Sequence, residues 1–314
     1  MDIINGVRTL QTSFSGSILT IGNFDGVHLG HRTLISALVA KAKELKLPAV
    51  VMTFEPHPVK VLYPERHLSR IFPFDDQVEQ LKALGVDALV VEPFSREFST
   101  LSRERFLLEW IYRPFNPKWM VVGYDFSFGA NRQGSIEFLH MQALRLGFGV
   151  EVIPPLKIGD APVSSSRIRQ AVIDGDATLA KSLLGRPFYL KGLIEKGAGR
   201  GRKIGVPTAN VRSNAELFPG LGVYAGWAYV RDQKYRAMIN VGVNPTFIDA
   251  RNQVLCIEAH LPDYQGSDLY GELMTIEFYK RLRSEKKFDS VQDLVQQIHL
   301  DIENGKRALD DKLG

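Results

Sequence analysis

From residue 18 onward, the first half of the chain alternates short apolar runs with segments of helical periodicity, and this restricts the fold more than any other feature. The run at 18–21 is followed by apolar residues at helical spacing, namely Leu34, Ile35, Leu38, Val39, Ala42 and Leu45. Further strands are predicted at 50–54, 88–91, 119–122 and 150–153, with helical stretches near 76–84, 102–111 and 135–146. This order indicates an α/β domain, in which helices flank a parallel sheet.

The second half of the chain has a different pattern. Gly185-Arg186-Pro187 interrupts the alternation, and strand-like runs follow at 188–195, 223–230, 235–241, 255–261 and 274–280. Such runs indicate an antiparallel barrel or sandwich, which a helix around 291–302 completes. Because 314 residues exceed what one hydrophobic core usually serves, we expect two domains, 1–185 and 186–314.

Composition and charge exclude several classes of protein. An apolar fraction of 45% and a charged fraction of 24% are typical of a folded globular chain. The apolar runs are short and the first five residues form no signal segment, so we expect a cytoplasmic protein with no membrane role. The single cysteine, Cys256, allows no intrachain disulfide. The basic stretch at 200–203 lacks interleaved aromatic residues, so no nucleic-acid partner is expected.

The loop after the first predicted strand reads GNFDGVHLGH at 22–31, and a helix begins at its end. His28 and His31 are three residues apart and should face the same side. With the free amides and the positive dipole of the helix terminus, they suit a polyphosphate, which Gly22 and Gly30 would let approach the backbone.

Two other readings of these histidines remain open at this stage. Two histidines at a helix start, without any other motif, more often belong to a capping turn and lie on the surface. A zinc site is the second alternative, but it lacks a third ligand at a plausible spacing unless His57 folds in.

A second anion-binding motif follows the last predicted strand of the same domain, where the chain reads VSSSRIR at 163–169. Ser164 is a natural helix N-cap, the first-turn amides form a further cradle, and Arg169 can reach back to a phosphate. Taken alone, this is an ordinary capped helix with a surface arginine. The two motifs together, in this order and each at a strand end, resemble the HxGH nucleotidyltransferase superfamily, which implies a Rossmann-like domain that binds ATP.

Further segments narrow the resemblance. FEPHP at 54–58 and GYDFSFG at 123–129 resemble the flavin-binding loops of bacterial bifunctional riboflavin kinase/FMN adenylyltransferases, and the resemblance covers essentially the whole chain. At the third position of that family's Ser-Ser-Thr pattern this chain has Ser166, which retains a hydroxyl. The resemblance implies flavin contacts from Phe54, Pro56, His57, Asp125, Phe126 and Phe128. It implies ATP contacts in the same domain from Gly22, Phe24, Asp25, His28, Gly30, His31, Ser164, Ser165 and Arg169.

In the second domain, GAGRGRKIGVPTAN at 197–210 is the densest glycine cluster and does not match a Walker A loop. It leads into a strand that places Thr208 and Asn210 on one face, where their oxygens suit Mg²⁺ held jointly with nucleotide phosphates. A flexible hairpin with solvated basic residues fits the glycine pattern equally well. The PTAN segment, however, resembles the riboflavin kinase signature. This implies nucleotide contacts from Gly199, Gly201, Lys203, Thr208 and Asn210.

Glu258 is the candidate general base of the second domain. In the run 255–261 it would project from the face opposite Ile257 and Ala259, and it could take a proton from an attacking hydroxyl. An exposed strand glutamate is the default interpretation, but Glu258 falls where riboflavin kinases carry their catalytic glutamate. RLRSE at 281–285 resembles the family's flavin-side segment, which implies a contact from Arg283 to flavin or its phosphate.

The resemblance therefore implies two reactions with small-molecule substrates. The second domain would phosphorylate riboflavin with Mg-ATP to give FMN, and the first would join FMN to AMP, giving FAD and pyrophosphate. A class I aminoacyl-tRNA synthetase also has an HxGH turn, but no Lys-Met-Ser-Lys-Ser motif is present. A non-catalytic flavin or nucleotide sensor would be expected to lose Glu258 or His28. A monofunctional FMN adenylyltransferase is a further alternative, and the pattern leaves the oligomeric state undetermined.

Overall fold

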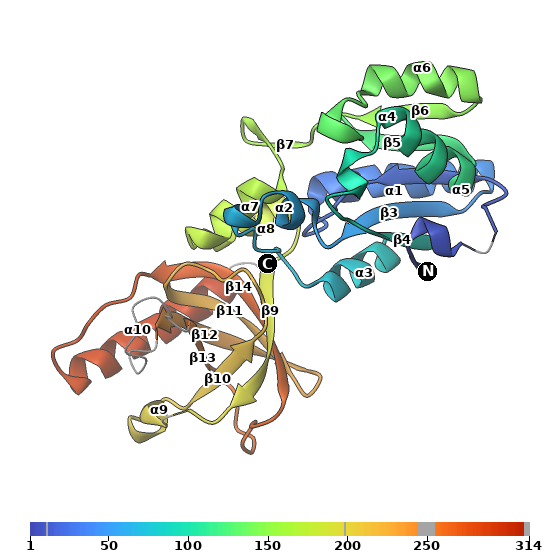
Figure 1. Ribbon diagram of the computed structural model, residues 1–314. Helices are drawn as coiled ribbons and strands as arrows, with labels where there is room; N and C mark the ends of the chain where they lie inside the picture. The colour runs from blue at the N-terminus through green and yellow to red at the C-terminus, as the bar shows by residue number, and fades with distance from the viewer. Residues whose placement is uncertain (11, 198, 244–254, 311–314) are drawn as a thin grey trace. The chain divides into compact units, whose positions relative to one another are not determined.

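A computed structural model describes residues 1–310 except 11, 198 and 244–254, and in the second unit it leaves the side chains of Arg200 and Lys203 undescribed (Figure 1). The chain divides into two compact units, Met1–Ser164 and Ser165–Gly314. This division differs from the boundary expected after residue 185. Helices α7 (Ser165–Ile173) and α8 (Ala177–Leu184) group with the second unit, because they pack on each other and α8 packs on β9 (Phe188–Glu195) and β14 (Leu273–Arg283).

The first unit is built on a parallel sheet with the strand order β1-β4-β3-β2-β5-β6. Its strands are β1 (Asp2–Asn5), β2 (Ser17–Ile21), β3 (Ala49–Glu55), β4 (Ala88–Pro93), β5 (Pro117–Gly123) and β6 (Gly149–Ile153). The α/β prediction is confirmed, with β1 as an edge strand that the sequence did not reveal. The order reverses between β2 and β5, so the loops that follow β3, β2 and β5 leave neighbouring strands at one edge.

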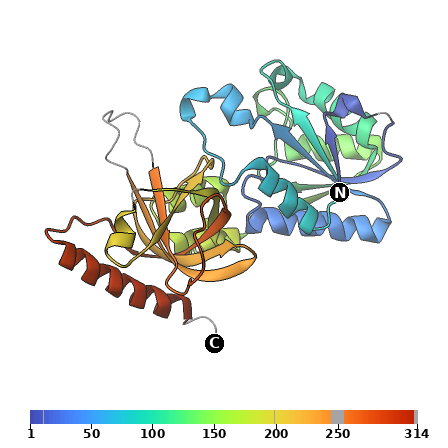
Figure 2. The ribbon, with the colours of Figure 1, turned by 90° about the horizontal axis from the view of Figure 1, so that it is seen from below.

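Helices cover both faces of this sheet (Figure 2). Successive strand residues point to opposite faces, so Ala49 and Val51 pack toward α1 (Leu29–Leu45) and α3 (Phe74–Ala83). Val50 and Met52 pack on the other side, toward η4 (Phe106–Tyr112) and α6 (Ile136–Leu146). The helix expected at 102–111 is divided into α4 (Arg103–Arg105), the π-helix η4 and α5 (Arg113–Phe115). The smaller elements are η1 (Val7–Thr9), α2 (Pro58–Leu62), η2 (Pro64–Arg66), η3 (Phe98–Thr100), η5 (Ala130–Arg132), β7 (Lys157–Ile158) and β8 (Ala161–Pro162).

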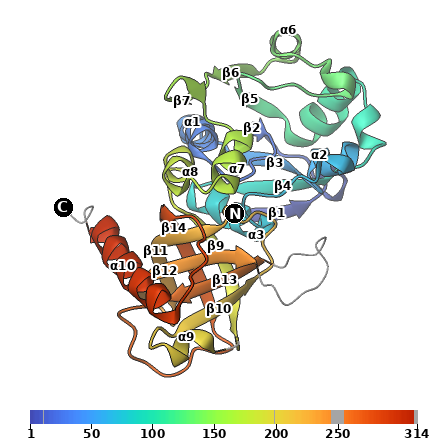
Figure 3. The same ribbon diagram turned by 90° about the vertical axis from the view of Figure 1, so that its left-hand side faces the viewer.

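The second unit is a closed antiparallel barrel with the order β10-β13-β12-β11-β14-β9 (Figure 3). Besides β9 and β14 it contains β10 (Thr208–Ser213), β11 (Gly222–Val230), β12 (Gln233–Val243) and β13 (Leu255–His260). The short helix α9 (Arg200–Lys203) precedes β10, and α10 (Val291–Asp310) packs on β11, β12 and β14. The structure thus selects a barrel over a sandwich. Among the described residues, no helix is long and apolar enough to cross a membrane.

Candidate active sites

His28 and His31 form one unit at the start of α1. His28 is the N-cap residue, and its Nδ1 accepts a hydrogen bond of 3.2 Å from the backbone N–H of His31. The two imidazole rings stack with centroids 3.6 Å apart and an interplanar angle of 15°. Because Nδ1 of His28 is an acceptor, the neutral ring carries its proton on Nε2, which is therefore the nitrogen able to donate to a ligand.

His31 has an environment that keeps its ring neutral. Burial, and then the nearby His28, hold the pKa of His31 well below its usual value. Its Nδ1 is buried and has no hydrogen-bond partner within the described part of the chain. The ring of Phe24 packs edge-on against it with centroids 5.3 Å apart. A buried ring nitrogen without a partner is costly unless a ligand completes its hydrogen bonding.

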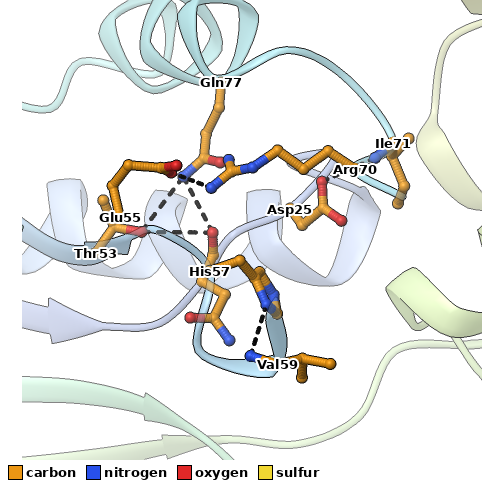
Figure 4. Close-up of polar contacts among 9 residues, drawn as sticks. Asp25, Thr53, Glu55, His57, Val59, Arg70, Ile71 and Gln77 are labelled. Atoms are coloured by element: carbon orange, nitrogen blue, oxygen red, sulfur yellow. Dashed lines mark hydrogen bonds and ion pairs between the residues drawn. The ribbon is translucent and has the colours of Figure 1, made fainter. Parts of the chain in front are cut away.

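The backbone of the loop before α1 is held in an uncommon conformation. Phe24, Gly26 and Val27 all have positive φ, at 47°, 81° and 38°. Asp25 is 2% exposed, and its carboxylate accepts a 3.1 Å hydrogen bond from the backbone N–H of Ile71 (Figure 4). Asp25 therefore anchors the loop through this hydrogen bond. The nucleotide contact expected for Asp25 stays a prediction.

Glycine at position 30 leaves room for the His28 ring, because it has no Cβ. A Cβ added there would stand 3.3 Å from Cε1 and Nδ1 of His28, and 3.8 Å from the carbonyl oxygen of Val163. The segment that precedes Ser164 therefore lies beside the histidine turn. At position 22 a Cβ would meet the ring of Phe24 at 3.0 Å. These two glycines thus make room for side chains of the loop itself.

A buried polar network joins the ends of β2 and β3 and was not predicted from the sequence (Figure 4). Nε2 of Gln77, from α3, donates to the backbone carbonyl of Asn23 at 3.0 Å and to Oγ1 of Thr53 at 3.4 Å. Thr53 donates to the same carbonyl at 3.4 Å. Arg70, whose side chain is buried, pairs with Glu55 beyond the end of this network. The sequence contained one indication of this network, because Thr53 is a polar residue in the otherwise apolar run 50–54.

The expected flavin-side residues of the first unit fall into two groups. Phe128 is 7% exposed and packs among Phe106, Phe126 and Phe138 with ring centroids 5.5–6.0 Å apart. His57 is also buried, and its Nδ1 caps α2 by accepting from the backbone N–H of Val59 at 3.2 Å. The residues with accessible surface are Phe54, Pro56, Asp125 and Phe126.

The two serines and the arginine of the second anion-binding motif lie where the units meet in sequence. Ser164 is the last residue of the first unit, and α7 begins at Ser165. Arg169 belongs to α7 in the second unit. The part that Arg169 plays at the nucleotide is therefore a proposal that rests on the motif.

In the barrel, Glu258 stands directly opposite Asn210 on the neighbouring strand. Both side chains are half-buried on the outer face, because Ile257 and Ala259 fill the interior. The Cys256 thiol lies 3.8 Å from Oδ1 of Asn210 and 3.9 Å from Oε1 of Glu258. Burial, followed by the Glu258 carboxylate, raises the pKa of Cys256, which keeps the thiol protonated.

The glycine-rich segment folds over the two oxygen donors expected to hold magnesium. A Cβ at Gly201 would stand 3.4 Å from Oγ1 of Thr208, and one at Gly197 would overlap the carboxamide of Asn210. Gly199 has a φ of 67° at the start of α9. Lys203 belongs to α9, but its side chain lies outside the described residues. The segment for which a flexible hairpin was the alternative therefore contains one helical turn and approaches both donors closely.

Arg283 is engaged by α10. Its Nε donates to both carboxylate oxygens of Asp301 at 3.0 and 3.1 Å, its Nη2 donates to Oδ2 at 2.8 Å, and its Nη1 donates to the carbonyl of Ser284 at 3.1 Å. The guanidinium also lies over Phe288, 5.7 Å from the ring centroid. The structure thus gives Arg283 a clamping role between β14 and α10.

The side chains at the two sites differ in which metal they could bind, zinc or magnesium. Within the described ranges, no group of three or more His, Cys, Asp and Glu side chains is placed to hold a metal ion. The zinc alternative therefore has no support at His28 and His31. The hydroxyl of Thr208 and the amide of Asn210 are hard oxygen donors, and such donors fit Mg²⁺, whose remaining ligands would be phosphates and water.

These sites define a class of protein: a two-part nucleotide-dependent transferase, with an HxGH turn on a parallel sheet and a second site on a β-barrel. The family model for FAD synthetase matches residues 10–167, and that for riboflavin kinase matches residues 184–309. The chain belongs to the bifunctional riboflavin kinase/FMN adenylyltransferase family, as its motifs predicted. The FMN adenylyltransferase part comes first and the riboflavin kinase part follows.

Relatives described as bifunctional riboflavin kinase/FMN adenylyltransferase match along most of the chain. The Bacillus subtilis protein is 38% identical over 91% of this chain and 90% of its own. The Haemophilus influenzae protein is 36% identical over 98% of both chains. A solved structure described as a macrolide-efflux protein from Streptococcus pneumoniae is 32% identical, covers 98% of this chain and 99% of that one, and has a TM-score of 0.88. The whole architecture is therefore shared with a solved protein.

Proposed function

We propose that this chain makes FAD from riboflavin in two steps at two separate sites. The barrel converts riboflavin and ATP to FMN and ADP, and the first domain converts FMN and a second ATP to FAD and pyrophosphate. The observation that carries the proposal is that the sheet and the barrel each have a polar site of their own, the stacked His28 and His31 and the pair of Asn210 with Glu258. We keep 1–185 and 186–314 as the two catalytic domains, and a cytoplasmic location remains a prediction.

In the adenylylation step, a phosphate oxygen of FMN attacks the α-phosphorus of ATP, and pyrophosphate leaves in line. Nε2 of His28 donates to the phosphates, and the first-turn amides of α1 add the positive end of the helix dipole. His31 is assigned to the same phosphates and stays neutral, because burial holds its pKa well below the usual value. Ser164, Ser165 and Arg169 are assigned to the same phosphates on their motif. Preorganised donors of this kind stabilise the charge that develops in the transition state.

The flavin of this step is assigned to the loops after β3 and β5. Phe54 and Phe126 have accessible aromatic surface, with Pro56 and Asp125 beside them in the two loops. We propose that these four residues contact the flavin. His57 and Phe128 are buried, so we propose that they support the conformation of these loops and do not contact the flavin directly.

In the kinase step, the 5′-hydroxyl of riboflavin attacks the γ-phosphorus of ATP while Glu258 accepts its proton, and ADP leaves. Thr208 and Asn210 are proposed to hold Mg²⁺, which when bound would neutralise charge on the phosphates. Gly199, Gly201 and Lys203 are proposed to surround the same phosphates. For Arg283 the contacts with Asp301 favour a positioning role at the flavin-side segment over a direct flavin contact.

The direct test incubates the purified chain with riboflavin, ATP and Mg²⁺ and separates the flavins by chromatography. FMN should appear first and FAD should follow, and supplied FMN should give FAD with one pyrophosphate per flavin. Omission of Mg²⁺ should abolish FMN formation. A sensor would bind flavin and leave it unchanged, and a monofunctional adenylyltransferase would convert FMN but not riboflavin. Either result would contradict the proposal.

A further inference from the structure

Glu258 lies between two carboxamide side chains that come from different strands. In the barrel, β13 runs between β10 and β12 (Figure 3). Asn210 of β10 pairs with Glu258 on one side, and Asn240 of β12 pairs with it on the other. Residues directly opposite each other on neighbouring strands have their side chains on the same face. Strands are about 4.8 Å apart, so the row from Asn210 to Asn240 spans about 10 Å.

The described part of the barrel makes no structural use of the Asn240 side chain. Its neighbours Ile239 and Val241 are buried in the interior, which leaves Asn240 half-buried on the outer face. Its side chain makes no hydrogen bond to any residue in the described ranges. A carboxamide has two donors and an acceptor to satisfy, and on a half-buried surface beside a carboxylate these groups are available to a ligand.

The two sides of Glu258 are not equivalent. On the Asn210 side lies the glycine-rich segment, because a Cβ at Gly197 would overlap the Asn210 carboxamide. On the Asn240 side lies Glu285, from the segment after β14. A Cβ at Gly242 would overlap Oε1 of Glu285 and would stand 3.3 Å from Nδ2 of Asn240. Glycine at 242 therefore makes room for the Glu285 carboxylate, which lies over this glycine beside Asn240.

We infer that Asn240 contacts the acceptor alcohol of the kinase reaction, the terminal hydroxyl of riboflavin, while Asn210 serves the nucleotide. The inference rests on the proposed role of Glu258. A hydroxyl donates one hydrogen bond and accepts others. Its hydrogen points to the Glu258 carboxylate, which removes the proton, and its oxygen accepts from Nδ2 of Asn240. The alcohol thus enters from the β12 side and the phosphates from the β10 side.

The test measures both Michaelis constants of FMN formation for Asn240→Ala and Asn210→Ala. Loss of one neutral hydrogen bond corresponds to roughly a two- to tenfold effect. Asn240→Ala should raise the KM for riboflavin by about that factor and leave the KM for Mg-ATP unchanged, whereas Asn210→Ala should do the reverse. Riboflavin affinity without ATP, read from flavin fluorescence, should fall in parallel for Asn240→Ala. The matched control is Gln233→Ala, an exposed carboxamide at the other end of β12, which should change neither constant.

Three results would overturn the inference: an unchanged riboflavin KM in Asn240→Ala, a change in the Mg-ATP KM instead, or an equal effect from Gln233→Ala. If Asn240→Ala has a lowered melting temperature, Asn240→Ser replaces it in the test. Serine keeps a small hydrogen-bond donor, so this variant should retain part of the riboflavin affinity. Glu258→Gln is assayed in parallel. If it forms FMN at the normal rate, the proposed kinase site itself is wrong. If it is slow while Asn240→Ala is normal, only the present inference fails.

Discussion

Replacement of Arg283 by methionine tests the ion pair that joins β14 to α10. Asp301 is 5% exposed and depends on Arg283 for charge neutralisation, with Nε2 of Gln297 as a further donor at 2.9 Å. Removal of one partner of a buried ion pair costs about 3–5 kcal/mol, because the other charge is left uncompensated. The Arg283 side chain is 22% exposed. We therefore expect a loss at the lower end, about 3 kcal/mol.

The assay is thermal unfolding of the barrel together with FMN formation. For a unit of this size, 1 kcal/mol corresponds to about 2–4 °C, so Arg283→Met should lower the melting temperature by roughly 6–12 °C. The double variant Arg283→Met with Asp301→Leu removes both charges and should recover most of the stability. If Arg283 only joins β14 to α10, the double variant should also have the wild-type KM for riboflavin. A single variant that melts like the wild type would refute the reasoning.

Other variants test the two domains and the histidine turn. A fragment that ends near Gly185 should convert FMN to FAD but leave riboflavin unchanged, and riboflavin phosphorylation by it would show that the domains are misassigned. His28→Ala and Arg169→Ala should each slow adenylylation roughly a hundred- to thousandfold while FMN formation stays near normal. Gly30→Ala, which improves helix propensity by up to about 1 kcal/mol, should melt near the wild type. It should nevertheless lose about tenfold in adenylylation, since its Cβ shifts His28; an unchanged rate would contradict this geometry.

The sequence predicted the elements whose periodicity is strong. Strands β2 to β6 and the barrel strands other than β10 were located to within a few residues, since each contains an apolar run. Strand β1 was missed because only four residues form it, at the sheet edge, and most of them are exposed. The one-turn helix α9 was missed because glycine-rich segments lack periodicity.

The sites were predicted less evenly, because motifs identify residues and tertiary contacts decide what those residues do. The HLGH turn was visible as a motif, but the ring stacking and the N-cap bond of His28 depend on the loop conformation. Arg283 and Asp301 are 18 residues apart, and no local pattern reveals their ion pair. The network of Gln77, Thr53 and Asn23 likewise joins three separate segments.

The most direct test of the two-site account is to measure both half-reactions on Glu258→Gln, which keeps the size of the side chain and removes the base. Positioned general-base catalysis contributes about a hundred- to ten-thousandfold, so FMN formation should fall by that order while the melting temperature stays the same. The adenylylation of supplied FMN should continue at nearly the normal rate. Normal FMN formation in this variant, or an equal loss of both activities, would contradict the account.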